Sequence, residues 1–253
     1  MKFKSAEFAL VVFDIGNTIV DAEKLIEVSS RYAAERMHSL KVIPDIDSLF
    51  KSYLETSKSL HHKHINRIFS DPLICARALT NAGLPSNEHN RYLLLTFFRK
   101  RLRQALRKDN SLISNLKTLK AHGLLLAALS DGTITEQYEL LDRLGVLEVF
   151  DHIRISEAYG EEKSSVNIFS DLLQHFALNR YQALMVGDDL RRDMQWASKA
   201  GYRTALQEQF IKHSPPLVRR FAKYVDYRVD GISQLCDVIL HTQPFQLSSN
   251  SDG

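Results

Sequence analysis

The chain has 253 residues, 44% hydrophobic and 25% charged, and a net charge of +3, which is typical of a soluble globular protein with one large domain or two modest ones. Its cysteines, Cys75 and Cys236, lie far apart in sequence, which excludes a disulfide framework and favours a reducing, cytoplasmic environment. No apolar run approaches the roughly 18 residues that span a membrane, and the N-terminal run has no cleavage site, so we expect neither a membrane segment nor a signal peptide.

The first predicted element is a strand over residues 8–13. This apolar run has no polar alternation, which is typical of a strand covered on both faces of a parallel sheet. Asp14 follows at the carboxyl end of the strand, the edge at which open α/β sheets bind ligands. A single aspartate there can also begin a turn or cap the next helix, so its role depends on what the rest of the chain brings to the same edge.

The following segment is predicted to be wholly helical. Residues 23–108 contain no convincing strand, and prolines and a glycine divide them into about four helices. We expect residues 21–108 to form a separate helical module whose connections to the rest of the chain act as hinges. Basic residues predominate from residue 51 to 108, which indicates anionic substrates, although a solvated helical face is the commoner reason for such a charge run. No RNA- or DNA-reading motif occurs there, so nucleic acid is not an expected partner.

Small polar and acidic residues follow two later apolar strands. The strand predicted over residues 124–129 leads into Ser130, Asp131 and Gly132. The strand over residues 183–186 leads into Gly187, Asp188 and Asp189, with Asp193 close behind. A capping box at residues 133–136 offers a structural explanation for the first group, as a turn between a strand and a helix. In a parallel sheet, both groups would lie at the same edge as Asp14.

Lys163 begins an amphipathic helix between these strands, where the helix dipole disfavours a cation, so its position favours a functional role. Alternating strands and helices predict an α/β fold with a doubly wound parallel sheet, formed by residues 1–20 and 109–241. Residues 242–253 have the polar composition of a disordered tail.

These residues, in this order, resemble the motifs of the haloacid dehalogenase-like (HAD) superfamily of phosphohydrolases. The matching positions are Asp14 with Thr18, Ser130, Lys163, and Gly187-Asp188 with Asp193. The resemblance extends from about residue 8 to residue 240 and implies a Rossmann-like core with an inserted helical cap of the family's first cap type. The family's phosphatases usually carry a second aspartate two residues after the first, where this chain has Gly16.

The resemblance implies a role for each matching residue. Asp14 would attack phosphorus and form an aspartyl-phosphate that water hydrolyses. Mg²⁺ would be held by Asp14, Asp188 and the backbone carbonyl of Gly16, with Asp189 or Asp193 as a further ligand or as a holder of water. The phosphate of a small phosphorylated substrate would be bound by Thr18, Ser130, Asp131, Gly132 and Lys163.

The glycine at position 16 leaves the reaction open to several interpretations. The missing aspartate would protonate the leaving group and activate water. Its absence is compatible with a leaving group of low pKa, with another residue or water that supplies the proton, or with a weakly active or non-catalytic binding relative. Cleavage of C–P or C–halogen bonds on the same scaffold is a further alternative, with Lys51 or Lys58 as a formal Schiff-base lysine in the C–P case. The sequence does not specify the substrate or the oligomeric state.

Overall fold

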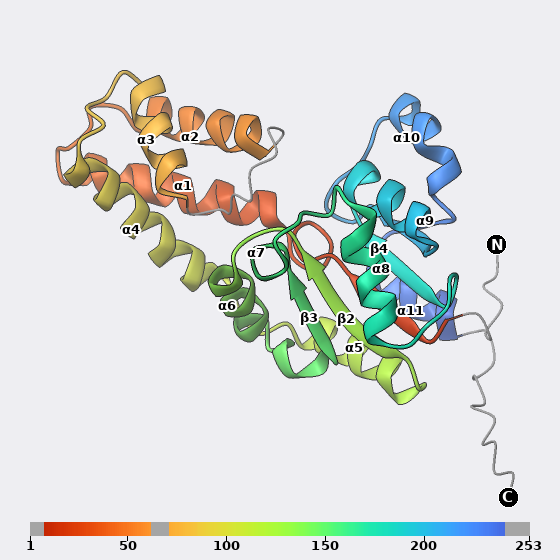
Figure 1. Cartoon of the computed structure of the whole chain (residues 1–253). Coiled ribbons are helices and arrows are strands. Elements are labelled where there is room, and N and C mark those ends of the chain that lie inside the picture. Colours follow the sequence, from red (N-terminus) through yellow and green to blue (C-terminus); the bar gives the residue numbers. More distant parts are fainter. Residues whose placement is uncertain (1–7, 62–70, 241–253) are drawn as a thin grey trace, which may run out of the picture. The chain divides into compact units, whose positions relative to one another are not determined.

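The computed structural model describes residues 8–61 and 71–240 (Figure 1). The chain forms two compact units, which we call the α/β unit and the helical unit. Among the described residues, the α/β unit comprises 8–20, 109–130 and 145–240, and the helical unit comprises 21–61, 71–108 and 131–144. The tail predicted to be disordered, residues 242–253, lies outside the described residues.

A six-stranded, wholly parallel sheet forms the centre of the α/β unit, with the strand order β3-β2-β1-β4-β5-β6. The strands are β1 (Leu10–Phe13), β2 (Leu125–Ser130), β3 (His152–Ile155), β4 (Ala183–Gly187), β5 (Arg203–Gln207) and β6 (Tyr227–Val229). The predicted α/β fold with a doubly wound parallel sheet is therefore confirmed.

Helices supply the parallel connections and bury the sheet. They are α5 (Asn110–Ala121), α7 (Ser156–Tyr159), α8 (Val166–His175), the π-helix η2 (Leu190–Gln195), α9 (Trp196–Ala200), α10 (Pro215–Phe221) and α11 (Ile232–Leu240), with short 3₁₀ turns at Leu147–Val149 and Ala222–Tyr224. Successive side chains of β1 point to opposite faces. Leu10 and Val12 share a core cluster with residues of α8 and α9, whereas Phe13 packs edge-on against Phe150. Every residue of β1 is buried, as its unbroken apolar sequence predicts.

The register aligns the carboxyl ends of the central strands. Phe13 pairs with Ala128 of β2 on one side and with Val186 of β4 on the other, and the N–H of Asp14 donates to the carbonyl of Val186 at 2.9 Å. Residues that follow β1, β2 and β4 therefore emerge at the same edge of the sheet.

The helical unit consists of α1 (Ala22–Ser39), α2 (Ile46–His61), α3 (Pro72–Asn81), α4 (Glu88–Ala105) and α6 (Ile134–Leu144). Helix α1 packs against α4, and α2 packs against α3. Polar side chains cap the N-termini of these helices. At the start of α1, for example, Asp21 accepts a 2.9 Å hydrogen bond from the N–H of Lys24. The rings of Tyr53 and Phe98 stack in the interior with centroids 5.0 Å apart.

Residues 131–144 differ from the sequence-based division, which assigned them to the α/β module. The structure groups them with the helical unit because α6 bonds Arg103 of α4 twice: Glu139 accepts from Nε of Arg103 at 2.7 Å, and Arg143 donates to the carbonyl of Arg103 at 3.3 Å. The division into a core and a cap as independent domains stays a prediction.

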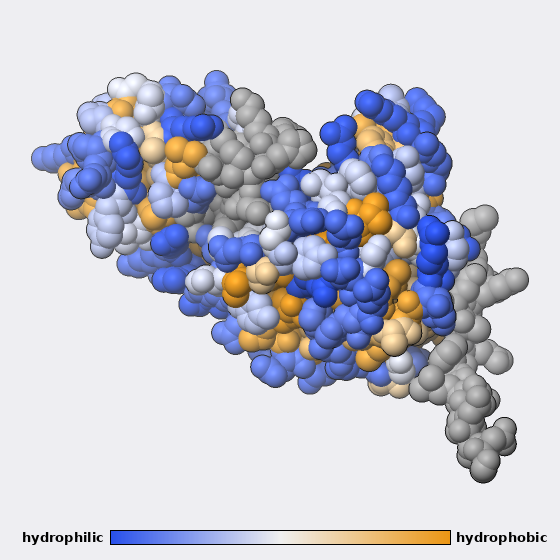
Figure 2. Space-filling model, in the orientation of Figure 1, coloured by the Kyte–Doolittle hydropathy of each residue, from blue (hydrophilic) through white to orange (hydrophobic). Residues whose placement is uncertain are grey.

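Most of the surface shown in Figure 2 is hydrophilic. Within the described part of the chain, no helix combines the length and apolar character that a bilayer crossing requires.

Candidate active site

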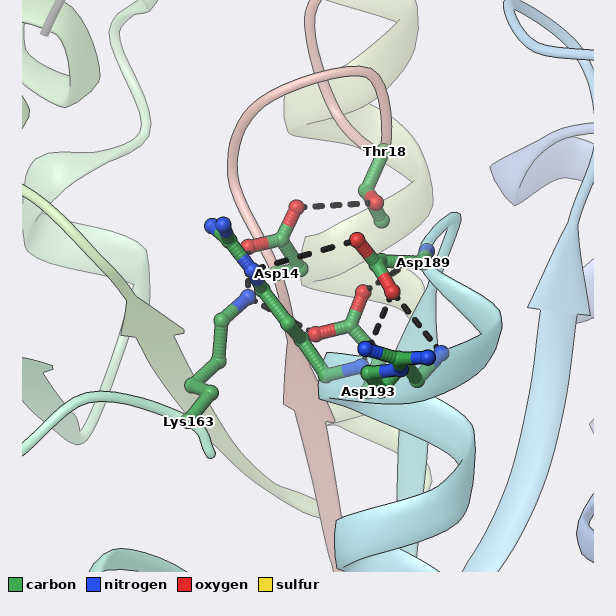
Figure 3. A network of polar contacts seen from close by, with 7 residues as sticks. Asp14, Thr18, Lys163, Asp189 and Asp193 are labelled. Atoms are coloured by element: carbon green, nitrogen blue, oxygen red, sulfur yellow. Dashed lines mark hydrogen bonds and ion pairs between the residues drawn. The ribbon is translucent and has the colours of Figure 1, made fainter. Parts of the chain in front are cut away.

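Acidic side chains and one lysine converge at the carboxyl edge of the sheet (Figure 3). Asp14 comes from the end of β1, Lys163 from the loop between α7 and α8, and Asp189 and Asp193 from the turn and π-helix that follow β4. Asp14 and Lys163 are 5% and 3% exposed, and Asp193 is completely buried. The structure thus brings together residues from positions 14 to 193 that the sequence placed at one edge.

Lys163 joins the ends of β1 and β4. Its Nζ donates to Oδ1 of Asp14 in a very short contact, and to Oδ1 of Asp193 at 2.7 Å. A buried ammonium group is stable only where charged or polar partners replace its hydration. Because Lys163 has a carboxylate from each strand as its partner, it fixes the position of Asp14 relative to the β4 turn.

Asp193 has both carboxylate oxygens occupied by protein donors. Oδ1 accepts from Lys163, and Oδ2 accepts from the N–H of Asp189 at 3.0 Å. Burial raises the pKa of Asp193 to about 7; Lys163 opposes the shift and Asp14 adds to it. A Cβ on Gly187 would lie 2.2 Å from Oδ2 of Asp193, so only glycine permits this close approach. Asp193 therefore links Lys163 to the turn that follows β4.

Asp188 has a different environment. Burial raises its pKa well above the usual range, and the charges of Asp14, Asp193 and Asp189 raise it further, against an opposing effect from Lys163. Within residues 8–61 and 71–240, no group donates a hydrogen bond to its carboxylate. This carboxylate therefore needs a cation or a proton to offset its neighbours.

The donors fit a hard divalent cation. Asp14, Asp188 and Asp193 each offer an oxygen, and these oxygens all lie within 4.8 Å of one another. Carboxylate oxygens are the ligands that Mg²⁺ prefers. Both oxygens of Asp193 accept hydrogen bonds from Lys163 and the N–H of Asp189, and those of Asp14 accept from Lys163 and Thr18, so Asp188 is the member of the three whose carboxylate has no donor within residues 8–61 and 71–240.

Asp189 caps the π-helix. Its Oδ1 accepts from the N–H groups of Arg191 and Arg192, both at 2.8 Å, and Nε of Arg192 lies 4.0 Å from Oδ2. Burial favours the neutral form of Asp189, but the N–H groups of Arg192 and Arg191 outweigh burial and lower its pKa. This carboxylate is consequently held in the ionised form by η2 itself.

The loop after β1 contains Thr18 and Gly16. Thr18 is completely buried, and its hydroxyl donates to Oδ2 of Asp14 at 3.2 Å. The turn is closed by a 2.7 Å bond from the N–H of Asn17 to the carbonyl of Val20, with Asn17 at a φ of 54°. Gly16 is half-buried and is not among the glycines with positive φ, so its backbone is open to other residue types.

The predicted phosphate-binding turn after β2 divides between the two units. Ser130 ends β2 and is 4% exposed, whereas Asp131 and Gly132 belong to the helical unit. Gly132 has a φ of 144°, and a Cβ there would lie 2.8 Å from Nε2 of Gln137. The catalytic, substrate-binding and metal-binding roles assigned to all these residues stay predictions.

Gln207 and His213 contact the site loops but were not among the predicted site residues. Gln207 donates to the backbone carbonyl of Thr18, and Nε2 of His213 lies 2.7 Å from the backbone carbonyl of Asp188. Gln207 is polar and ends a strand, so the reasoning that identified Asp14 and Ser130 could have found it. No sequence pattern indicates His213.

Comparisons with known proteins give a consistent family. The sequence profile described as haloacid dehalogenase-like hydrolase matches residues 11–207. The chain is 27% identical over 238 residues to glyceraldehyde 3-phosphate phosphatase of Pyrococcus furiosus, an alignment that covers 91% of this chain and 92% of the relative.

Solved structures with the same fold include proteins of both hydrolytic types. The defluorinating L-2-haloacid dehalogenase Rha0230 superposes with a TM-score of 0.69 at 17% identity, over 94% of this chain and 99% of that one. A HAD phosphatase from Thermococcus onnurineus superposes with a TM-score of 0.65 at 19% identity, over 93% and 99%. At these identities the likeness concerns the fold alone.

Proposed function

Because the chain belongs to the haloacid dehalogenase-like hydrolase family, we propose that it is a Mg²⁺-dependent phosphatase of a small phosphorylated metabolite, with Asp14 as the nucleophile. The observation that carries the proposal is the buried cluster of Asp14, Lys163, Asp188 and Asp193 at the carboxyl edge of the sheet. The phosphatase relatives that align over about nine-tenths of the chain, such as the Pyrococcus furiosus enzyme, support it.

In the first step, a carboxylate oxygen of Asp14 attacks phosphorus, and the bond from phosphorus to the leaving oxygen breaks. Thr18 and Lys163 hold the two oxygens of this carboxylate, which restricts it to one orientation. Orientation of this kind accounts for a large part of catalysis in phosphoryl transfer. In the second step, water attacks the phosphorus of the aspartyl-phosphate, which releases inorganic phosphate and regenerates Asp14.

Positive charge at the site offsets the charge of the phosphoryl group. Lys163 supplies one ammonium group between Asp14 and Asp193. We assign Asp14, Asp188 and the carbonyl of Gly16 to Mg²⁺, with Asp193 as the residue that orients Lys163 and the β4 turn. Bound Mg²⁺ would supply further positive charge to offset that of the phosphoryl group. Ser130, with the N–H groups that follow it, is assigned to the phosphoryl oxygens.

The leaving group departs with an electron pair and needs a proton unless its conjugate acid is strong. Gly16 has no side chain with which to deliver one, so the chain favours leaving groups of low pKa or delivers the proton through water. We assign residues 21–108 to the family's first cap type, since this segment follows β1 and its described residues form helices without a strand. We also propose a cytoplasmic location, which the unpaired, buried Cys75 and Cys236 support.

Phosphate release from a panel of phosphorylated metabolites, with Mg²⁺ and then with a chelator, tests the proposal. We expect Mg²⁺-dependent release that Asp14→Asn abolishes. Halide release from 2-haloacids without phosphate release would identify a dehalogenase instead. An absence of both activities would favour a binding relative.

A further inference from the structure

Gln207 is a completely buried amide with a partner at each end. Its Nε2 donates to the backbone carbonyl of Thr18 at 2.9 Å, and its Oε1 accepts from the N–H of Gln209 at 2.8 Å. A carbonyl can only accept and a backbone N–H can only donate, so these partners fix the orientation of the amide. Its contribution to the site is one directed hydrogen bond.

This hydrogen bond reaches across the sheet. Gln207 ends β5, and β4 lies between β5 and β1 in the strand order, yet the amide contacts the loop that follows β1. Thr18, whose carbonyl it binds, donates its own hydroxyl to Oδ2 of Asp14 at 3.2 Å. Gln207 is therefore linked to Asp14 through one intervening residue.

His213 makes a parallel contact with the other site loop. It lies in the segment between β5 and α10, and its Nε2 is 2.7 Å from the carbonyl oxygen of Asp188. Because that oxygen only accepts, Nε2 carries the proton in this contact. His213 is partly buried.

The chain that leaves β5 thus holds both loops of the site by their backbone carbonyls. We propose that Gln207 and His213 are positioning residues of the phosphatase: Gln207 fixes the loop that carries Thr18 and Asp14, and His213 fixes the turn that carries Asp188. This proposal rests on the proposed function and extends it to residues outside the family's motifs. Loss of such supporting contacts costs about 10- to 100-fold in metal affinity or activity in other metal sites.

Variants that remove the donor test each contact. Gln207→Met is neutral and of similar length but loses both partners, whereas Gln207→Glu retains an acceptor for Gln209 and, at a pH at which it is ionised, has no proton to donate to Thr18. His213→Phe keeps a ring without a donor, whereas His213→Gln places an amide N–H at a similar reach. Lys212→Gln is the matched control, since Lys212 adjoins His213 and forms an exposed ion pair with Asp230 at 2.8 Å.

Steady-state kinetics with p-nitrophenyl phosphate, Mn²⁺ titration followed by EPR, and thermal unfolding separate the roles. For folded Gln207→Met, we expect kcat to fall by about 10- to 100-fold with little change in KM. For His213→Phe, we expect Mn²⁺ to bind about 10- to 100-fold more weakly, and His213→Gln to recover most of this loss. Lys212→Gln should match the parent in each measurement.

A folded Gln207 variant with the parent's kcat, or a His213→Phe variant with the parent's Mn²⁺ affinity, would overturn the corresponding assignment. If Gln207→Met is too unstable to assay, Gln207→Glu decides the first point from kcat measured as a function of pH, since the donor to Thr18 is lost only where the glutamate is ionised. If the parent hydrolyses no phosphoester, the proposed function fails separately. Binding of beryllium trifluoride to Asp14, followed by fluorine NMR, then replaces kcat: unchanged binding in the Gln207 variant contradicts the proposal, and weaker binding supports it.

Discussion

Replacement of Lys163 by methionine is the most severe test of the buried charge cluster. The side chain keeps its length and loses only the ammonium group, which removes the donor to Asp14 and to Asp193 at once. Both carboxylates remain buried, and breaking a buried ion pair from one side costs about 3–5 kcal/mol. At about 2–4 °C for each kcal/mol in a chain of this size, the midpoint of thermal unfolding should fall by about 6–20 °C.

The loss of stability in the Lys163→Met variant should depend on pH, because protonation of a carboxylate relieves the repulsion between Asp14 and Asp193. Burial already raises the pKa of Asp193 to about 7, and Lys163 opposes that shift, so the variant should protonate Asp193 at still higher pH. Urea unfolding of metal-free protein at about pH 5 and pH 8 should thus give a larger loss at pH 8. Lys120→Met is the control: its ion pair with Asp151 at 2.8 Å is partly exposed and should contribute about 1 kcal/mol or less. If Lys163→Met lowers the free energy of unfolding no more than Lys120→Met does, the buried ion pairs of Lys163 do not contribute the stability assigned to them.

Other predictions address chemistry and metal binding. Asp14→Asn should retain the fold and lose turnover, and activity within about tenfold of the parent, roughly 1.4 kcal/mol in barrier, would exclude covalent catalysis. Asp188→Ala should make activity insensitive to added Mg²⁺; an unchanged half-saturation would locate the metal elsewhere. Gly16→Asp should fold, because the backbone at Gly16 has no positive φ. The added carboxyl can donate a proton, so the variant should hydrolyse alkyl phosphates up to about 10²–10⁴-fold faster and its rate should depend less on leaving-group pKa. A folded variant no faster than the parent would assign proton delivery to another group. In metal-free parent protein, stability should fall as pH rises from about 4 to about 7, since the raised pKa values of Asp188 and Asp193 make the unfolded chain release its protons first; urea unfolding with and without Mg²⁺ should show that the metal removes this loss.

The fold class, and the convergence of polar residues at one edge of the sheet, could be predicted because they depend on local patterns. The apolar run of β1 has no alternation, and its residues are buried on both faces of the sheet. Asp14 and Asp188 each follow a strand and Ser130 ends one, and parallel strands deliver such residues to one edge. The family match over residues 11–207 confirms the predicted hydrolase family.

Contacts between distant segments could not be predicted in this way. Helix α6 joins the helical unit through Glu139 and Arg103, which lie on helices separated by a strand, and their pairing leaves no periodic signal. Gln207 and His213 bind backbone carbonyls, and a carbonyl acceptor has the same chemistry whichever residue carries it. Side-chain identity at the acceptor therefore contains no information about the contact.

The two acids after β4 show where sequence spacing stops being informative. Asp189 and Asp193 are four residues apart, so an α-helix would present both on one face as equivalent ligands. The structure has a π-helix here: the N–H of Met194 reaches the carbonyl of Asp189 at 3.2 Å, five residues back. The side chain of Asp193 is buried against Gly187 and binds Lys163, whereas the side chain of Asp189 caps the N-terminus of the same helix. The wider turn separates the roles of Asp189 and Asp193. Of the four acids in this cluster, Asp14, Asp188, Asp189 and Asp193, it is Asp188 whose carboxylate has no protein donor among the described residues.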